Sequence, residues 1–592
     1  MNFDRLSLVA TLGLAAASPS CSLALELGDS VSCTVDEDCL YGAGMGTCDA
    51  NVCRPPGSAS GGSETDTDPS STTGPTTTVS STLTTESSES SPETTLDSSS
   101  SESTGTPVAC AVNSECENDQ RCGAAGECVE LLTTECQEVF WPADRDNVVF
   151  IGSVMPTSEP YTNLLQPLEN AVLLGVEDFN AETELQGDRE VAYVRCDDTA
   201  GPAASLAAAT HLVENVGVAA IVGPIFSETV LAIAESVTIP AGTFMISPTA
   251  SAMSVADLDD DNLVWRTIPG DVYQSNALVD RFDDLDDSGG VDNLLVLAKD
   301  DAYGNGVLTA ILSDLEADLG ASNVTQAVYP NPTDFGGDME MLLAAYGTVL
   351  AGVSDDAPFS HVLFVGTSEI QVLLYAYLGT LWDGNPATMP LFTVSHGAVP
   401  EMERFINEIG PGTGTEALEP AKGLIVANME GTSPVVLNPA NFNAFSIRYR
   451  IRFNDEEPLT SSALGYDATM ATLFAMCRVP AGEEVTGTAI AAGMPALVDG
   501  DTFISFSGSD LSFIDEARNA LAVGGTVDLQ GVSGELQWDL ETGDVRAGVW
   551  GWELLGESDD PVSAPTRIYC LNPEPATDGA WEAPEAPPAS CG

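Results

Sequence analysis

The stretch V-V-F-I-G, residues 148–152, is a continuous apolar run. Apolar residues then recur every three or four positions, at Leu165, Leu168, Val172, Val176 and Phe179. The first pattern is typical of a strand buried on both faces, and the second is typical of an amphipathic helix. This part of the chain is therefore expected to open with a strand followed by a helix.

Three more apolar runs follow, and each ends in polar residues. Residues 191–194 lead into Cys196-Asp197-Asp198, residues 219–223 lead into Ser227, and residues 243–246 lead into Ser247, Thr249 and Ser251. Strands that alternate with helical patterns favour an α/β fold with a doubly wound parallel sheet. Ligands of such sheets bind beyond the carboxyl ends of the strands, so the Ser/Thr clusters are candidates for a small polar ligand.

The chain is strongly acidic. Its 592 residues include 90 acidic and 18 basic side chains, which gives a formal net charge of −72, and Lys299 and Lys422 are its only lysines. Such a chain is repelled by nucleic acid and by anionic lipid. A solvated acidic surface accounts for the charge. The alternative is a calcium site at Asp257, Asp259 and Asp261, but that loop lacks the glycine and the glutamate of the full calcium motif, so no metal site is predicted.

Residues 1–21 are typical of an export signal, because Arg5 precedes a short apolar segment that ends near Cys21. Cys21 could accept a lipid and anchor the protein to a membrane, although Ser18 and Pro19 depart from the usual lipoprotein pattern. Simple secretion is the alternative. No later run is long and apolar enough to span a membrane.

Fourteen cysteines support export, because disulfides persist in oxidising compartments. Residues 22–56 and 108–136 are predicted to be small disulfide-rich modules, because each contains a cluster of four cysteines, which are Cys33, Cys39, Cys48 and Cys53 in the first and Cys110, Cys116, Cys122 and Cys128 in the second. Their spacing does not fit a zinc site, and four cysteines allow three pairings. The intervening Ser/Thr/Pro/Glu-rich residues 57–107 are predicted to be a disordered linker, and residues 576–592 to be a Pro-rich tail.

Seven motifs between residues 148 and 572 are similar, in order, to those of the leucine/isoleucine/valine-binding protein family. They are V-E-D-F-N-A (176–181), R-C-D-D-T (195–199), I-V-G-P-I-F-S-E-T (221–229), F-M-I-S-P-T-A-S (244–251), W-R-T-I-P-G-D-V-Y-Q (265–274), K-D-D-A-Y-G (299–304) and G-E-L-Q-W-D-L-E-T-G-D (534–544). Members of this family are type I periplasmic binding proteins, which serve as the solute receptors of ABC transporters.

The resemblance implies two Rossmann-like lobes within residues 137–575, joined by a three-strand hinge. The first lobe would comprise residues 148–269 and 426–529, and the second would comprise residues 271–425 and 530–572. A ligand would bind in the cleft, and the lobes would close over it by hinge motion.

The family site carries over onto eight residues of this chain. Ser227, Thr249, Ala250 and Ser251 match the groups that hold a ligand carboxylate; the alternative is that Ser227 and Ser247 only cap helices. Asp271 matches an acid near the ligand ammonium, and Tyr303 matches a tyrosine that closes over the ligand from the second lobe.

Two site positions depart from the family. Thr367 replaces an aromatic residue, and His396 stands where amino-acid binders have a glutamate. A neutral histidine pairs poorly with an ammonium group, so the ligand is expected to be a carboxylate-bearing or otherwise polar solute, with an ordinary α-amino acid in doubt. The family's early disulfide is missing, and we expect Cys196 to pair with Cys136 and Cys477 to pair with Cys570.

The predicted function is therefore capture of a small carboxylate-bearing ligand for an ABC permease. The alternative is a tethered surface receptor that uses the same domain for sensing or adhesion. An enzyme is not predicted, because the chain has only three histidines and no nucleophile elbow, zinc-protease motif or P-loop. No cofactor and no nucleic-acid partner are predicted.

Overall fold

The computed structural model describes most of the chain from residue 109 onward. The described ranges are 109–158, 161–199, 201–335, 338–353, 358–395, 399–411, 415–434, 438–508, 510–556, 561–571 and 579–583, with four short strands between residues 40 and 54. The predicted export signal, Cys21, the linker and His396 lie outside these residues. Among the described residues, no helix combines the length and the apolar character needed to cross a membrane.

The four short strands belong to a separate compact unit, Gly13–Gly105. Strand β1 (Leu40–Tyr41) pairs with β2 (Gly44–Met45), and β3 (Thr47–Asp49) pairs with β4 (Val52–Arg54), both antiparallel. The described residues of the first cysteine-rich region thus form two short antiparallel strand pairs.

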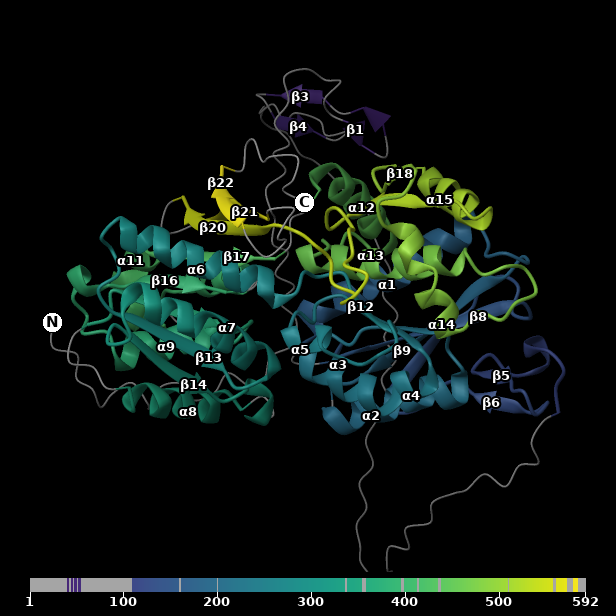
Figure 1. The fold of residues 1–592 in the computed structure, drawn as a ribbon, viewed down its shortest axis with the longest axis horizontal. Helices are drawn as coiled ribbons and strands as arrows, with labels where there is room; N and C mark the ends of the chain where they lie inside the picture. The colour runs from purple at the N-terminus through teal and green to yellow at the C-terminus, as the bar shows by residue number, and fades with distance from the viewer. Residues whose placement is uncertain are drawn as a thin grey trace, which may run out of the picture. The chain divides into compact units, whose positions relative to one another are not determined.

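The first lobe, in which Figure 1 labels β8, β9 and β12, contains a six-stranded sheet in the order β12-β11-β10-β8-β9-β7. Its strands are β7 (Cys136–Phe140), β8 (Val148–Met155), β9 (Glu190–Asp197), β10 (Ala220–Val222), β11 (Phe244–Ser247) and β12 (Val264–Arg266). Neighbours from β12 to β9 are parallel, and only β7 runs antiparallel at the edge. The predicted doubly wound sheet is confirmed, and the predicted strands 148–152 and 191–194 each prove longer.

Helices cover this sheet as the apolar spacing predicts. Helix α1 (Thr162–Glu182) buries Leu168, Val172, Val176 and Phe179 completely or nearly so. It packs against α13 (Thr460–Met476), which is buried along almost its whole length. The other helices of this lobe are α2 (Pro202–His211), α3 (Ser227–Ile233), α4 (Ile239–Ala241), α5 (Met253–Ala256), α12 (Pro439–Arg452), α14 (Gly487–Ala491) and α15 (Ser512–Ala522). A small parallel pair, β18 (Thr502–Ser505) and β19 (Val527–Gln530), completes it.

The second lobe contains an eight-stranded mixed sheet in the order β14-β13-β15-β16-β17-β20-β21-β22. Its strands are β13 (Leu294–Lys299), β14 (Val324–Tyr329), β15 (His361–Val365), β16 (Leu391–Val394), β17 (Met429–Ser433), β20 (Val549–Leu555), β21 (Val562–Leu571) and β22 (Gly579–Glu582). The first five are parallel, and β20 to β22 extend the sheet in antiparallel fashion. The helices are α6 (Asp271–Asp287), α7 (Ala302–Leu319), α8 (Met339–Ala351), α9 (Ile370–Thr380), α10 (Val399–Asn407) and α11 (Lys422–Ala427).

The crossovers differ from the expected boundaries. Strand β17 pairs with β16 and β20, so the second crossover follows Ser433 rather than residue 426. Residues Val532, Leu536, Trp538 and Val545 belong to the core of the first lobe, so the third crossover comes shortly before β20 rather than at residue 530. Strand β22 lies within the predicted Pro-rich tail.

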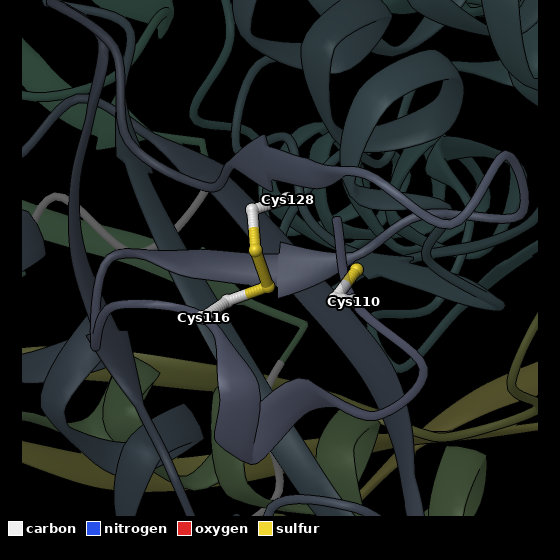
Figure 2. Close-up of side chains that lie close together, drawn as sticks. All are labelled: Cys110, Cys116 and Cys128. Atoms are coloured by element: carbon white, nitrogen blue, oxygen red, sulfur yellow. A yellow bond between two sulfur atoms is a disulfide. The ribbon is translucent and has the colours of Figure 1, made fainter. Parts of the chain in front are cut away.

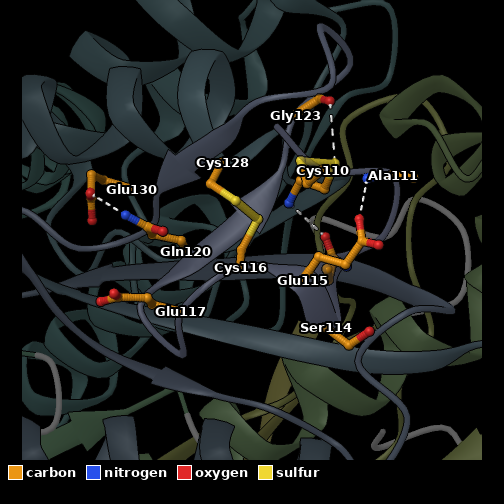
Figure 3. Close-up of a disulfide and its surroundings, with 12 residues drawn as sticks. Cys110, Ala111, Ser114, Glu115, Cys116, Glu117, Gln120, Gly123, Cys128 and Glu130 are labelled. Atoms are coloured by element: carbon orange, nitrogen blue, oxygen red, sulfur yellow. Dashed lines mark hydrogen bonds between the residues drawn. A yellow bond between two sulfur atoms is a disulfide. The ribbon is translucent and has the colours of Figure 1, made fainter. Parts of the chain in front are cut away.

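The second cysteine-rich module is closed by Cys110–Cys122 and Cys116–Cys128. Sulfur atoms of Cys110, Cys116 and Cys128 lie within 4.8 Å of one another (Figure 2). Because all three are oxidised, they offer a metal no thiolate. Figure 3 shows the second of these bridges, which joins Cys116, ahead of β5 (Gln120–Cys122), to Cys128 at the start of β6 (Cys128–Glu130). A hydrogen bond of 2.6 Å from Gln120 Nε2 to Glu130 Oε1 links β5 and β6.

Two further cysteine pairs were predicted, and one is confirmed. Cys136 forms a disulfide with Cys196, which fastens edge strand β7 to β9. The predicted Cys477–Cys570 bridge is wrong: Cys477 is a free thiol in the core of the first lobe, while Cys570 is in a disulfide. Burial raises the pKa of Cys477 to about 12.

Candidate functional site

The hydroxyl residues predicted from the sequence meet at the carboxyl ends of β10 and β11. Ser247 Oγ donates to the Pro224 carbonyl at 2.6 Å, and Thr249 Oγ1 donates to the Ile225 carbonyl at 2.8 Å. Ser227 Oγ accepts from the Ala252 amide at 3.2 Å. The two loops therefore brace each other. Ser227, at the start of α3, keeps its hydroxyl proton available for an acceptor.

The Ala250 amide is less available than the sequence suggests, because it donates to Ser247 Oγ at 3.1 Å. Part of the hydrogen-bonding capacity of these hydroxyl and amide groups is thus already used by bonds within and between the two loops. The carboxylate-binding role of Ser227, Thr249, Ala250 and Ser251 stays a prediction.

A buried ion pair stands where the chain first crosses between lobes. Arg266 Nε lies 2.5 Å from Asp544 Oδ1, and both side chains are buried. Arg266 Nη1 also donates to the carbonyls of Ala250 and Ala252, at 3.1 and 2.8 Å. The approach is tight, since a Cβ placed on Gly270 would lie 2.6 Å from Asp544 Oδ2. Arg266 thereby connects the first crossover to the loop that carries Thr249, Ala250 and Ser251.

Asp271 follows Gly270 and is the first residue of α6. Its amide donates to the Ser251 carbonyl at 2.8 Å, and the residue is only 1% exposed. Neither carboxylate oxygen has a partner of normal hydrogen-bond geometry among the described residues. Burial raises the pKa of Asp271 to about 7, against the opposing effect of the Ser251 hydroxyl and Arg266. An unpartnered buried acid favours a ligand that brings a hydrogen-bond donor or a cation.

The second lobe presents Tyr303 in the first turn of α7. Its hydroxyl lies 2.8 Å from Ser395 Oγ and 3.4 Å from Gln274 Oε1. Gln274 lies on α6, the helix that begins with Asp271, so Tyr303 contacts that helix within the second lobe. Burial raises the pKa of Tyr303, and the charge of Asp271 adds to that rise. The ligand-binding roles of Tyr303 and Asp271 stay predictions.

A buried lysine and glutamate lie beside Thr367, and neither was predicted as a site residue. Lys299 Nζ is 2.8 Å from Asp301 Oδ2, 3.2 Å from Thr367 Oγ1 and 4.0 Å from Glu369 Oε1. Burial works to lower the pKa of Lys299, but Glu369 and Asp301 outweigh it and raise the pKa. The group therefore stays charged inside the protein. The K-D-D-A-Y-G motif contained the signal, since lysine is so rare in this chain.

The two lobes approach each other at this cluster. Helix α7 contacts α3 and α5, and Met253 Cε would lie 4.0 Å from a Cβ placed on Gly306. Tyr161, next to the start of α1, is half-buried with its ring 5.9 Å from that of Phe226. Burial raises the pKa of Tyr161, and the charge of Lys299 acts against that rise. Lys299 thus acts electrostatically on a tyrosine of the opposite lobe.

Other acidic residues have local structural roles. Asp260, within the run considered for calcium, accepts from the amides of Asn262 and Val264 at 3.0 and 2.6 Å. An open depression on the first lobe is lined by Asp499, Trp538 and Arg546, among others, and contains none of the predicted site residues.

The fold defined by these two sheets and three crossovers is the type I periplasmic binding fold. Residues 148–357 match the family described as "Periplasmic binding protein". Two solved structures share the fold, each with a TM-score of 0.50 and 16% identity over 71% of this chain. They are a possible leucine/isoleucine/valine-binding protein from Rhodopirellula baltica, 96% covered, and a periplasmic binding protein type 1 from Bordetella pertussis, 100% covered.

A curated relative is the chemotactic signal transduction system substrate-binding protein BasB of Halobacterium salinarum. It is 29% identical over 222 residues, which are 36% of this chain and 52% of the relative. The match thus spans about half the length of that protein. The likeness to the periplasmic binding protein family thus covers residues 148–357, and the likeness in fold extends over both lobes.

Proposed function

We propose that this protein is an exported solute-binding protein that captures a small amino-acid-like ligand between its lobes. It acts by binding and release, with no bond made or broken in the ligand. In the proposed cycle, the closed, loaded form delivers the ligand to an ABC permease. The family match supports the class of protein, and the polar residues at the hinge support the kind of ligand.

Asp271 is the observation that carries the proposal. A carboxylate buried at a crossover between lobes, with neither oxygen in a hydrogen bond of normal geometry among the described residues, is costly without a ligand. A ligand ammonium group would satisfy both oxygens and favour the ionised form. Closure of the lobes would then gain free energy only when ligand is present, as a solute receptor requires.

The ligand carboxylate is assigned to the hydroxyl loops opposite. Ser227 can donate its hydroxyl proton, and Thr249 and Ser251 lie on the loop that Arg266 braces. The positive end of α3 adds little, since the helix is short. His396 stays a predicted contact, on the ammonium side of the ligand.

The test is isothermal titration of the full chain with α-amino acids, their amides and related carboxylates. We expect Asp271→Asn to abolish binding and Ser227→Ala to weaken it by about 1–3 kcal/mol, the usual cost of a charged group left without a partner. Asp467→Asn is the matched control. Asp467 is also fully buried with its pKa raised by burial to about 7, but the Val532 and Ser533 amides already satisfy it. Full affinity in Asp271→Asn would refute the site.

A sensory role is the second candidate, favoured by the likeness to a chemotactic substrate-binding protein. In that role the closed form would signal to a membrane receptor rather than load a permease. Deleting the gene in its native host separates the two: lost ligand uptake supports transport, whereas normal uptake with a lost behavioural response supports sensing. Lipid anchoring through Cys21 is proposed for either role, and the mass of the mature amino terminus tests it.

A further inference from the structure

Lys299 is an unusual residue in this protein. It is one of two lysines in a chain of 592 residues with a net charge of −72, and it is only 4% exposed. It ends β13, at the carboxyl edge of the second sheet, where the family's ligands bind. Most lysines lie on the surface, so a buried one at a ligand-binding edge calls for an explanation.

Lys299 is held by hydrogen bonds that use only part of its donor capacity. An ammonium group has three donors. Asp301 Oδ2 at 2.8 Å and Thr367 Oγ1 at 3.2 Å take two of them, while Glu369 Oε1 at 4.0 Å is too far for a hydrogen bond. The third donor has no acceptor among the described residues.

The surrounding charges restrict which acceptor the third donor of Lys299 can bind. Glu369 is ionised, because Lys299 and the hydrogen bonds from Thr367 overcome burial and lower its pKa. Lys299 therefore faces two carboxylates, Glu369 and Asp301, and the cluster carries a net negative charge. A further carboxylate would be repelled, and an aliphatic group would leave the buried donor unsatisfied.

Tyr161 places this cluster at the approach of the two lobes. It belongs to the first lobe, where its ring lies 5.9 Å from that of Phe226, the residue before α3. Helix α3 contacts α7, which begins just after Lys299, and the charge of Lys299 acts against the burial-driven rise of the Tyr161 pKa. In the proposed pose, the Asp271 carboxylate holds the ligand ammonium group. A ligand side chain that extends from there toward the second lobe would meet Lys299 and Thr367 on one side and Tyr161 on the other.

We propose that Lys299, Thr367 and Tyr161 line a second subsite in which the remaining donor of Lys299 binds a neutral oxygen of the ligand side chain, while Thr367 holds the lysine in place. The preferred ligands are therefore amino-acid-like solutes with an amide or hydroxyl side chain, and branched aliphatic or acidic side chains bind weakly. This inference rests on the proposed function and specifies its substrate class. Glu369 is a positioning residue, since it holds Thr367 through two hydrogen bonds.

Two series of side chains with matched size test this subsite in the full chain. Titrations compare L-asparagine with L-aspartate and L-leucine, and L-glutamine with L-glutamate and L-methionine. We expect the amide to bind at least about tenfold more tightly than both counterparts in one series, because a site built to bond a polar group rejects analogues that lack it. Lys299→Met should remove that preference.

Lys422→Met is the matched control. Lys422 is also buried, but its Nζ lies 3.5 Å from the Asn407 carbonyl, within the second lobe and on another helix. This variant should keep the wild-type ranking. If Lys299→Met fails to fold, the wild-type ranking alone decides.

The possible outcomes distinguish failure of this inference from failure of the proposed function. Tightest binding of leucine, methionine or an acidic amino acid would overturn the subsite and leave solute binding intact. Amide preference retained in Lys299→Met would overturn the role of the lysine. Failure of every amino-acid-like solute to bind would overturn both.

Discussion

Replacing Asp271 by asparagine should make the empty protein more stable while it removes ligand binding. The pKa of this acid is about 7 in the fold, because of burial, and 3.8 in the ordinary reference state. Ionised Asp271 is thus disfavoured by folding. The difference corresponds to about 4 kcal/mol at about 1.4 kcal/mol per pH unit, as an upper limit.

The sign of the pH dependence follows from the raised pKa. Below pH 3.8 the acid is protonated in both states and costs nothing. Between 3.8 and about 7 the unfolded chain releases the proton first, so the wild-type protein loses stability as pH rises. Asparagine cannot ionise. The gain in Asp271→Asn should therefore be largest at pH 8 and less than half as large at pH 5.

The assay is urea denaturation of wild type and Asp271→Asn without ligand at both pH values, with Asp467→Asn beside them. Subtracting the wild-type curve removes the effect of Asp467, which titrates in the same range. Asp271 also faces Arg266, Asp544, Asp301 and Ser251, which are present in both proteins. An equal gain at the two pH values, or a loss at pH 8, would refute the reasoning.

Three further predictions concern the hinge and the disulfide. Affinity for a ligand with an ammonium group should fall about tenfold per pH unit below pH 7, because Asp271 must ionise to hold it; a flat titration profile would contradict this. Replacing Cys136 and Cys196 by serine should cost about 4 kcal/mol, from a closed loop of 60 residues, as measured by denaturation under oxidising conditions. Arg266→Met should cost about 3–5 kcal/mol because it strands buried Asp544, and adding Asp544→Asn should restore part of the melting temperature.

Local patterns predicted the first lobe well. The strand β8 and helix α1 follow from the spacing of apolar residues alone. A strand buried on both faces gives a continuous apolar run, and a helix buried on one face gives apolar residues every three or four positions. The meeting of Ser227 with the loop of Thr249 follows from parallel strands, whose carboxyl ends share one edge. The Cys136–Cys196 pair was also foreseen, since both cysteines flank the first strands.

Long-range choices could not be foreseen from those patterns. Strand β17 could join either sheet, and its partner β20 comes more than a hundred residues later. Cys477 was expected in a bridge, but the surroundings of α13 leave it a buried thiol. The burial of Asp271 and Lys299 was equally hidden, because charged residues are normally exposed and only tertiary contacts keep these inside.

The burial of both lysines makes amine-directed chemistry a probe of opening. We expect a reagent that modifies primary amines to reach the buried side chain of Lys299 when the second lobe draws back from the first. Lys422 would report unfolding of the second lobe instead. The ratio of the two labelling rates, read by mass spectrometry in one sample, would therefore time the parting of the lobes without any engineered dye.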